Sequence, residues 1–386
     1  MEHNFDIVVQ KYGGSSVAEP QKITKVAGFI KKRLENNQRL CVVVSAMGDT
    51  TNELLNLAKQ VNPEPPKREL DMLLSCGERS SMALLAMALT HQGVKALSLT
   101  GSQSGIITDE CHSGAQLVAI RPHRVLEAFK THEVVIIAGF QGVSRSREIT
   151  TLKRGGSDTT AVAMAAALKA ALCEIYSDVP GLMSIDPRIA ACAELVSEVS
   201  FAEACAFSLY GAKVLAHDAA QLAQDLGVKL LIAQSGEPEC GTNVREVIIS
   251  PTKTRVVTCV THLRGVIKLE LLQSDLAAFG DGYFLCGAWH NNKLIGYASN
   301  DIAQELPSLL SSQITPGLAL LTIHVAHQHT ILGVIARLLD IFKKNNLETL
   351  DIISGSAQIF IVMNDELLNH AMSIVHHGLV EHWGGR

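Results

Sequence analysis

The sequence predicts an α/β fold, a three-layer αβα sandwich with a largely parallel central sheet, followed by a smaller α+β region. Short runs rich in Val and Ile alternate with longer segments in which apolar residues recur every three or four positions. This alternation is typical of parallel sheets covered by helices on both faces, which bind ligands at the carboxyl ends of their strands. After "SGEPECGTNV" the rhythm changes to apolar-polar alternation, which predicts the second region.

The elements of the first region follow from these two periodicities. Strands are predicted at the β-branched apolar runs: 6 to 11, 40 to 45, 94 to 99, 133 to 139, 172 to 177 and 228 to 233. Helices are predicted between them, at 20 to 36, 51 to 60, 69 to 90, 121 to 131, 158 to 171 and 209 to 225.

The second region is predicted to contain two small α+β modules. In the first, at 256 to 312, "RGVIKLELL" is a strand, a hairpin turns at Asn291 and Asn292, and Pro307 interrupts a helix. The second lies at 318 to 377. Its predicted elements are a strand at 318 to 325, a helix at 330 to 345 capped by Thr330, strands at 347 to 353 and 357 to 363, and a helix at 365 to 377.

Composition is that of an ordinary globular protein of 386 residues with a formal net charge of -5, which gives no general attraction to nucleic acid or to anionic membranes. The nine cysteines include no CxxC pair and no metal-ligand spacing, so we expect reduced thiols and no metal site. "MEHNFDIVV" lacks a basic leader and no uninterrupted apolar run reaches membrane length. These features predict a cytoplasmic protein.

A glycine pair follows the first predicted strand in "IVVQKYGGSS". Gly13 and Gly14 allow close approach of a ligand to the backbone, while Lys11 and Ser15 supply a cation and a hydroxyl. Together they can cradle phosphate oxygens, although the order of residues is not that of a Walker A loop. The alternative is a simple strand-to-helix turn.

The strongest local signal is "TTLKRGGSDTTAVAMAAALKAAL", which joins a cation, two glycines and an acid at a predicted helix start. Its residues are Arg154, Gly155, Gly156, Ser157 and Asp158. Arg154 can hold a carboxylate, and Asp158 can orient the reacting groups. Ser157 or Asp158 can also cap the helix. The alternative is that Asp158 only caps the helix and Arg154 is a surface residue.

An acid, Glu78, lies within the apolar helical stretch "LLSCGERSSMALLAMAL". A buried carboxylate without a partner is costly. Glu78 therefore either faces a bound amino group or pairs with Arg79 or another internal base.

Polar side chains also follow two more predicted strands. The first set is Ser45, Asp49, Thr50 and Thr51. Its hydroxyl residues, Ser45, Thr50 and Thr51, either contact a substrate or cap a helix that begins near Asn52. The second set is Ser177 and Asp178, then Asp186 and Arg188 beyond a Pro-Gly turn. Asp178 and Arg188 are an acceptor and a cation of the kind that ribose hydroxyls and phosphates require.

Eight short segments follow one another along the chain: "KYGGSS", "VVSAMGDTTNEL", "LLSCGER", "AGFQGV", "TTLKRGGSDTTA", "YSDVPGL", "DPR" and "GAKVL". In this order they resemble the aspartokinases of the amino-acid kinase family, of the type with a C-terminal ACT region. The resemblance covers most of residues 5 to 245. It implies ATP-dependent phosphorylation of the β-carboxylate of L-aspartate to 4-phospho-L-aspartate, the first step toward lysine, threonine and methionine. It also implies a kinase domain at 1–250 and an ACT-like region at 251–386.

The resemblance implies a role for each matching residue. Lys11, Asp158 and Lys213 act in catalysis; Glu78 holds the α-amino group and Arg154 the α-carboxylate. The acceptor pocket further includes Ser45, Asp49, Thr50, Thr51, Gly155, Gly156 and Ser157. The ATP site includes Lys11, Gly13, Gly14, Ser15, Ser177, Asp178, Met183, Arg188 and Lys213. Mg2+ is held mainly by the ATP phosphates.

Two departures from the family pattern lie near these sites, Lys153 in place of a usual glycine and Met183 in place of a common tyrosine. In the C-terminal region, 318 to 377 resembles one ACT module and 256 to 312 a degenerate copy. This difference predicts weak or absent feedback by lysine and threonine, or control by an unfamiliar ligand, and the loop "HVAHQHTILGV" of the fuller module could form part of an amino-acid effector site. ACT modules pair edge to edge, which implies a homodimer.

Two other functions stay open at this point. One is a sensor that keeps the amino-acid and nucleotide pockets without catalysis, and the other is a related kinase acting on glutamate, acetylglutamate or another aspartate analogue. The set Lys11, Glu78, Arg154, Asp158 and Lys213 favours catalysis, and the pair Glu78 and Arg154 favours an acceptor with an unmodified α-amino group.

Overall fold

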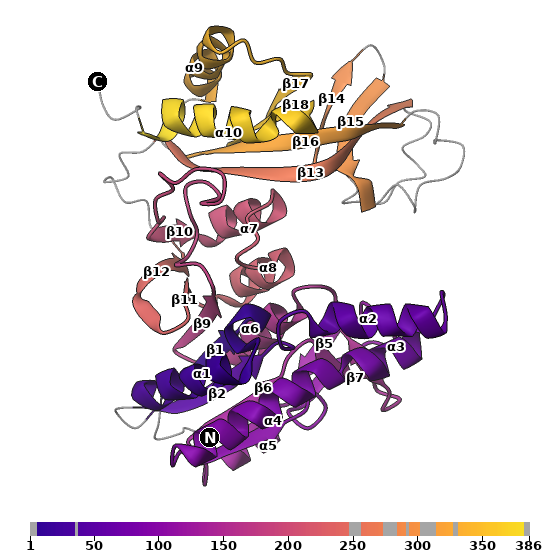
Figure 1. Ribbon diagram of the computed structural model, residues 1–386, viewed down its shortest axis with the longest axis vertical. Helices are drawn as coiled ribbons and strands as arrows, with labels where there is room; N and C mark the ends of the chain where they lie inside the picture. The colour runs from indigo at the N-terminus through magenta and orange to yellow at the C-terminus, as the bar shows by residue number, and fades with distance from the viewer. Residues whose placement is uncertain are drawn as a thin grey trace. The chain divides into compact units, whose positions relative to one another are not determined.

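The computed structural model describes residues 6–34, 38–246, 256–272, 284–290, 293–301, 314–326 and 331–381 of the chain (Figure 1). The chain forms two compact units. The first is Met1–Leu182, Ser197–Ser208 and Lys213–Ile248, and the second is Met183–Val196, Leu209–Ala212 and Ile249–Arg386. Two short segments from the first 250 residues therefore group with the C-terminal unit.

The first unit is built on an eight-stranded sheet with the order β10-β12-β11-β9-β1-β2-β6-β3. Its strands are β1 (Ile7–Tyr12), β2 (Arg39–Val44), β3 (Ala96–Leu99), β6 (Val134–Ala138), β9 (Leu172–Ser177), β10 (Glu198–Ser200), β11 (Leu230–Gln234) and β12 (Glu237–Arg245). All six predicted strands are present and pair in parallel, and β12 pairs antiparallel with β11. The α/β fold with a largely parallel sheet is confirmed.

Helices cover both faces of this sheet. On one face, α1 (Pro20–Arg33) and α4 (Cys76–His91) pack on alternate residues of the strands, such as Val8 and Val42. On the other face, α6 (Gly156–Leu168) contacts β1, β2 and β9 and packs against α8 (His217–Leu226). Lys11 is on the strand face opposite Val8, because successive side chains of a strand alternate in direction.

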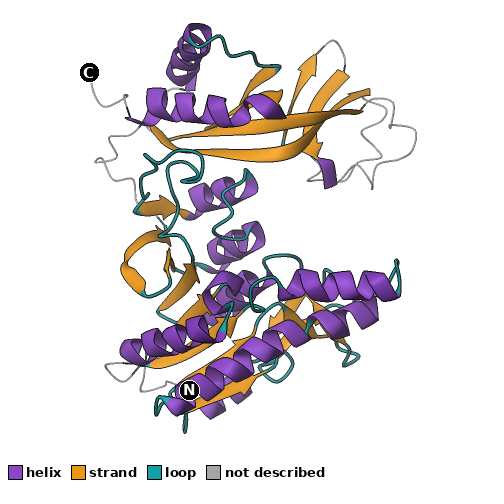
Figure 2. Cartoon of the chain, in the orientation of Figure 1, coloured by secondary structure: helices purple, strands orange, loops and turns teal. Residues whose placement is uncertain are grey.

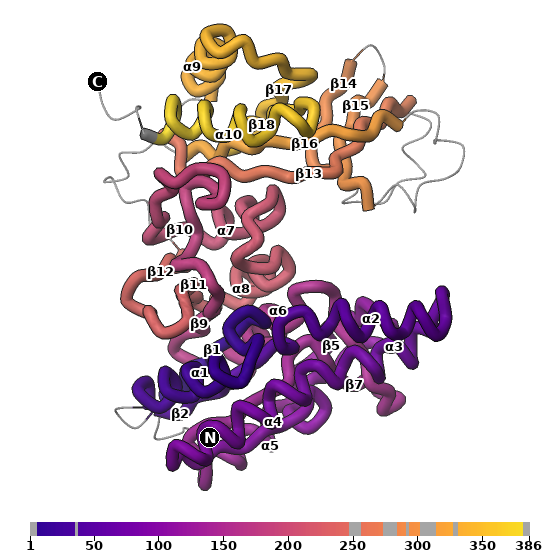
Figure 3. The backbone as a smooth tube through the Cα atoms, in the orientation of Figure 1, coloured from indigo at the N-terminus to yellow at the C-terminus, as the bar shows by residue number. Residues whose placement is uncertain are grey.

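The predicted helix at 69 to 90 is divided into α3 (Lys67–Leu74) and α4 (Figure 3). Ser75 lies between the two helices. The Ser75 carbonyl accepts a hydrogen bond from the Gln141 side chain at 2.9 Å. The whole stretch Lys67–His91 is long and apolar enough to cross a membrane by length and composition alone. It carries the charged residues Glu78 and Arg79, and α4 packs on β2, β3 and β6 as a core helix does.

The prediction of one helix at 209 to 225 is wrong. The structure has α7 (Phe201–Leu209) and α8, and residues 210–216 between them are not helical. Gly211 has φ +110°, and a Cβ there would lie 1.9 Å from the His262 carbonyl oxygen. This close approach requires glycine and a non-helical backbone. It depends on a residue distant in sequence, so helical periodicity does not reveal it.

The remaining helices and a second sheet complete the first unit. The helices are α2 (Thr50–Val61) and α5 (His123–Ala128). The second sheet was not predicted and has the order β5-β4-β7-β8, with β4 (Ile106–Thr108), β5 (Leu117–Ile120), β7 (Gln141–Val143) and β8 (Ile149–Thr151). Strands of three or four residues are too short to show a periodic pattern.

The second unit is a six-stranded sheet, β14-β15-β13-β16-β18-β17, on which helices pack (Figure 2). Its elements are β13 (Val257–Leu272), β14 (Cys286–His290), β15 (Lys293–Ser299), β16 (Ile314–Val325), β17 (Asp351–Ser354), β18 (Gln358–Asn364), α9 (Ile331–Lys344) and α10 (Leu368–His376). The predicted hairpin is confirmed by antiparallel pairing of β14 with β15. The predicted features at Asn291, Asn292, Pro307 and Thr330 lie outside the described residues.

Candidate active site

A pocket of about 620 Å³ opens in the first unit, between the ends of β1 and β2, the start of α6, and helices α2, α3 and α4. The predicted residues that line it are Lys11, Gly14, Ser45, Thr51, Glu78, Arg154, Gly155, Gly156, Ser157 and Asp158. Residues separated by more than 140 positions therefore share one cavity. Asp49 and Thr50 are not among the lining residues.

Lys11 and Asp158 form an ion pair inside this pocket. Lys11 Nζ lies 2.6 Å from Asp158 Oδ1, and their side chains are 12% and 8% exposed. Asp158 Oδ2 accepts a hydrogen bond from the Ala216 backbone N–H at 3.1 Å. The pair holds the Lys11 ammonium in the pocket wall, where a phosphate or carboxylate oxygen can compete for it.

Neither Ser157 nor Asp158 caps α6, so the capping alternative is wrong. The N-cap is Gly155, with φ +84°, and no side chain caps the helix. A Cβ on Gly155 would lie 2.4 Å from the Ala216 Cβ, so the turn requires glycine in both conformation and space. Asp158 lies in the first turn of α6, where its charge pairs with Lys11.

Glu78 extends from α4 and is 3% exposed. Its Oε1 accepts a hydrogen bond from the Ala46 backbone N–H at 3.2 Å, whereas Oε2 is buried with no hydrogen-bond partner among the described residues. Burial raises the pKa of Glu78 to about 7. The alternative pairing with Arg79 is wrong, because Arg79 Nε donates instead to Gln141 Oε1. Glu78 therefore has an acceptor oxygen available to a bound cation.

Arg154 and Lys153 lie at the exposed rim of the same pocket. Neither is in an ion pair with another described residue. Because Lys11 and Asp158 neutralise each other, the remaining charges are the two rim cations and the buried Glu78. This distribution suits a ligand that carries both a carboxylate and an ammonium group.

Of the predicted polar residues that follow β2, Ser45 and Thr51 line the pocket. Helix α2 begins at Thr50 rather than near Asn52, with Asp49 as its N-cap residue and no side-chain cap. Asn52 Nδ2 donates to Asp49 Oδ1 at 2.5 Å. The capping alternative for the hydroxyl groups is therefore wrong, and Thr51 and Asn52 both line the pocket.

Residues 6–234 match the model of the amino acid kinase family. The chain belongs to the amino acid kinase family. It is 47% identical over 268 residues to an aspartokinase of Mycolicibacterium smegmatis, covering 69% of this chain and 64% of the relative. It is 49% identical over 240 residues to an aspartokinase of Geobacillus stearothermophilus, covering 62% and 59%. The chain thus spans roughly three-fifths of the length of these relatives.

Solved structures agree with this family assignment. An aspartate kinase from Synechocystis is 31% identical, with a TM-score of 0.58 over 97% of this chain and 69% of that chain. E. coli aspartokinase III in complex with aspartate and ADP gives a TM-score of 0.83 at 21% identity, over 97% of this chain and 100% of that chain. The second match shows similarity of fold.

In this member of the amino acid kinase family, several residues that the sequence resemblance assigns to the ATP site do not line the pocket. Gly13 donates its N–H to the Tyr176 carbonyl at 3.2 Å, and Ser15 is exposed beside it. Ser177 ends β9, followed by the exposed Asp178. Lys213 is exposed in the turn between α7 and α8.

The other two nucleotide residues, Met183 and Arg188, belong to the second unit. The Met183 carbonyl accepts a hydrogen bond from Cys259 Sγ, and Arg188 pairs with Asp186 at 2.7 Å. Their roles stay predictions. Across the described residues, no group of three or more His, Cys, Asp or Glu side chains is placed to hold a metal ion.

Sequence reasoning missed part of the pocket wall. The additional lining residues are Ala46, Gly48, Asn52, Leu55, Leu70, Leu74, Ser113, Phe140, Thr151 and Leu152. Thr151 and Leu152 belong to the same motif as Arg154, so their proximity to the site was accessible from the sequence. Ser113 comes from a loop with no motif of its own and reaches the pocket only through tertiary contacts.

Proposed function

We propose that this protein is an aspartate kinase, which transfers the γ-phosphoryl group of ATP to the β-carboxylate of L-aspartate and forms 4-phospho-L-aspartate. The observation that carries the proposal is the buried Glu78 carboxylate, whose Oε2 has no partner among the described residues, in one pocket with Lys11 and the exposed Arg154. An α-ammonium on Glu78 and an α-carboxylate on Arg154 leave the β-carboxylate directed toward Lys11.

The chemistry fits these groups. A carboxylate is already a nucleophile, so the acceptor needs no strong general base. The barrier lies in bringing two anions together and in stabilising the charge of an in-line transition state. Lys11 supplies a cation for that charge, and Asp158 holds Lys11 in place. Mg2+, bound mainly through the ATP phosphates, supplies further neutralisation when present.

The proposal is tested by trapping the acyl phosphate with hydroxylamine in the presence of ATP and Mg2+. We expect hydroxamate from L-aspartate, and little from glutamate or acetylglutamate, with omission of ATP as the control. No ATP-dependent hydroxamate from any of the three favours a sensor without catalysis. A preference for glutamate or acetylglutamate contradicts the choice of substrate.

Arg154→Ala is expected to raise the KM for aspartate about 10- to 100-fold, because it removes a charged partner of the α-carboxylate. The kcat and the KM for ATP should change only a few-fold. The matched control is Lys153→Ala, the adjacent exposed cation at the same rim, which should have a smaller effect. If steady-state kinetics show that both substitutions raise the KM for aspartate equally, the positive charge of the rim attracts aspartate and Arg154 makes no specific contact with its α-carboxylate.

We also propose that residues 1–250 are the kinase domain and 251–386 an ACT-like region, in which 256–312 is a degenerate module. β14 and β17 are the edge strands of the six-stranded sheet, and edge strands offer backbone groups for pairing with a second copy. We further propose that the protein is a cytoplasmic homodimer and that an amino-acid effector binds to the ACT-like region.

A further inference from the structure

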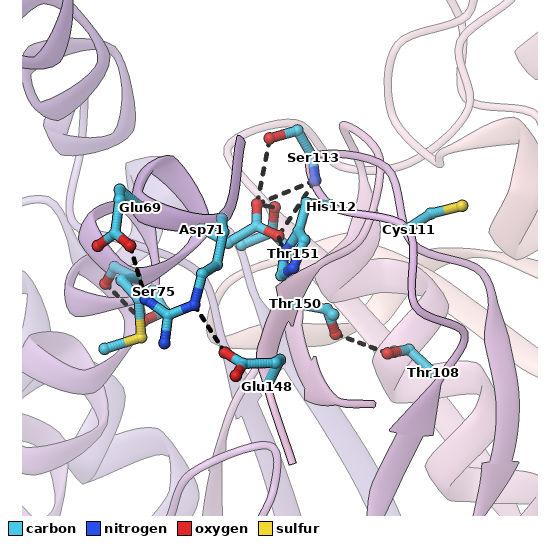
Figure 4. Close-up of polar contacts among 12 residues, drawn as sticks. Glu69, Asp71, Ser75, Thr108, Cys111, His112, Ser113, Glu148, Thr150 and Thr151 are labelled. Carbon is cyan, nitrogen blue, oxygen red and sulfur yellow. Dashed lines mark hydrogen bonds and ion pairs between the residues drawn. The ribbon is translucent and has the colours of Figure 1, made fainter. Parts of the chain in front are cut away.

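Asp71 is a fully buried acid of α3 that sequence reasoning did not single out. Its carboxylate accepts hydrogen bonds from side chains and backbone of two other chain segments (Figure 4). The donors are Ser113 N at 3.0 Å and Thr151 Oγ1 at 2.5 Å to Oδ1, Ser113 Oγ at 3.2 Å to the same oxygen, and His112 Nδ1 at 2.7 Å to Oδ2. Such a set of donors offsets the cost of burying the charge.

The partners of Asp71 form part of the pocket wall. Ser113 and Thr151 both line the pocket, as do Leu70 and Leu74, which flank Asp71 on α3. Ser113 has φ +60°, an uncommon conformation for a serine, and its backbone N–H points to the Asp71 carboxylate. Asp71 itself does not line the pocket, so it acts on the pocket through these partners.

The same contacts connect the two elements that carry the proposed substrate-binding groups. α3 continues past Ser75 into α4, which carries Glu78. Thr151 ends β8 and lies three positions before Arg154. The hydrogen bond that the Thr151 hydroxyl donates to Asp71 therefore fixes the helix pair of Glu78 against the strand that leads to Arg154.

We propose that Asp71 is a positioning residue that sets the spacing between Glu78 and Arg154, and thereby the fit of the amino-acid acceptor. This inference rests on the proposed aspartate kinase function. A shift of α4 relative to β8 changes the distance between Glu78 and Arg154. This weakens the binding of a short ligand whose ammonium and carboxylate groups must contact both residues at once. The nucleotide is not held by this spacing, so its affinity should not change.

The neighbouring residue offers a matched control on the same strand. The Thr150 hydroxyl lies 2.6 Å from the Thr108 hydroxyl, both side chains are buried, and neither residue lines the pocket (Figure 4). Because side chains alternate along a strand, Thr150 and Thr151 point to opposite faces of β8. Thr150→Val and Thr151→Val each remove one buried hydroxyl hydrogen bond and keep the side-chain shape.

The test compares the kinetics of these two variants with those of the wild type, together with Thr151→Ser. Thr151→Val should raise the KM for aspartate about tenfold, with kcat and the KM for ATP nearly unchanged. Thr151→Ser, which keeps the hydroxyl, should restore the wild-type KM. Thr150→Val should lose thermal stability to a similar extent without a change in the KM for aspartate.

Two different failures can be distinguished. If the wild type forms no hydroxamate from aspartate, the proposed function is wrong and this inference fails with it. If the wild type is active but Thr151→Val and Thr150→Val have the same KM for aspartate, Asp71 and Thr151 are only structural. A Thr151→Ser variant as impaired as Thr151→Val also overturns the positioning role.

Discussion

Replacing Lys11 with alanine is expected to lower kcat about 100- to 1,000-fold, the effect of removing one charged group that stabilises a transition state. Its ammonium lies in the pocket, 2.6 Å from Asp158. Under the proposed function, the phosphoryl group meets the acceptor beside this ammonium. The KM for ATP should change only a few-fold, because the charge that Lys11 neutralises develops mainly during transfer. A coupled assay of ADP release measures both constants.

The Lys11→Ala experiment needs a control, since it leaves the buried Asp158 carboxylate without its ion-pair partner. In the double variant Lys11→Ala/Asp158→Asn that unpaired charge is absent, so thermal stability should recover while kcat stays low. Lys25→Ala, at an exposed lysine of α1, should have wild-type kinetics. Recovery of kcat in the double variant would show that Lys11 is structural only.

Replacing Glu78 with glutamine is expected to raise the KM for aspartate about 100-fold, because the proposed partner of the α-ammonium loses its charge while its shape is kept. The Gln side chain can still accept the Ala46 hydrogen bond, so the fold of α4 should be retained. Steady-state kinetics with varied aspartate provide the measurement. A variant with the wild-type KM would contradict contact between Glu78 and the amino group.

The raised pKa of Glu78 gives this substitution a pH signature. The pKa is about 7 in the folded protein against an ordinary value of 4.5, so the folded state binds the proton more tightly. The stability that this group contributes is present below pH 4.5 and is lost as pH rises to about 7. Glu78→Gln should therefore be more stable than the wild type at pH 8, with no such gain at pH 4.5.

Aspartate binding should show the complementary dependence on pH. Below pH 7 the unliganded Glu78 is protonated and cannot pair with an ammonium group, so the wild-type KM for aspartate should rise as the pH falls from 8 to 6. In Glu78→Gln this dependence should be absent. If the KM for aspartate depends on pH equally in the wild type and in Glu78→Gln, the dependence comes from a titratable group other than Glu78.

The fold of the first unit could be predicted because its central strands are buried on both faces. Such strands are continuous apolar runs, which is why β1, β2, β6 and β9 were found within a residue or two. The short strands of the second sheet have no comparable signal. The predicted helix through Gly211 failed because a tertiary contact with His262 decides the backbone there.

The convergence of Lys11, Glu78 and Arg154 could be predicted from motifs at strand and helix ends. Asp71 could not, although it is also an acid among apolar residues in "ELDMLL". Its partners His112 and Thr151 lie 41 and 80 positions away, and neither spacing has a periodic signature. A buried acid in a helix indicates that a partner exists, whereas the identity of that partner is a property of the folded chain.

The central claim, that one pocket holds both ends of aspartate with its side chain toward the phosphoryl group, is tested most directly by a crystal structure with L-aspartate and a non-hydrolysable ATP analogue. We expect the α-ammonium at Glu78 Oε2, the α-carboxylate at Arg154 and the β-carboxylate beside Lys11. Aspartate bound in the reverse orientation, or outside this pocket, would contradict the account.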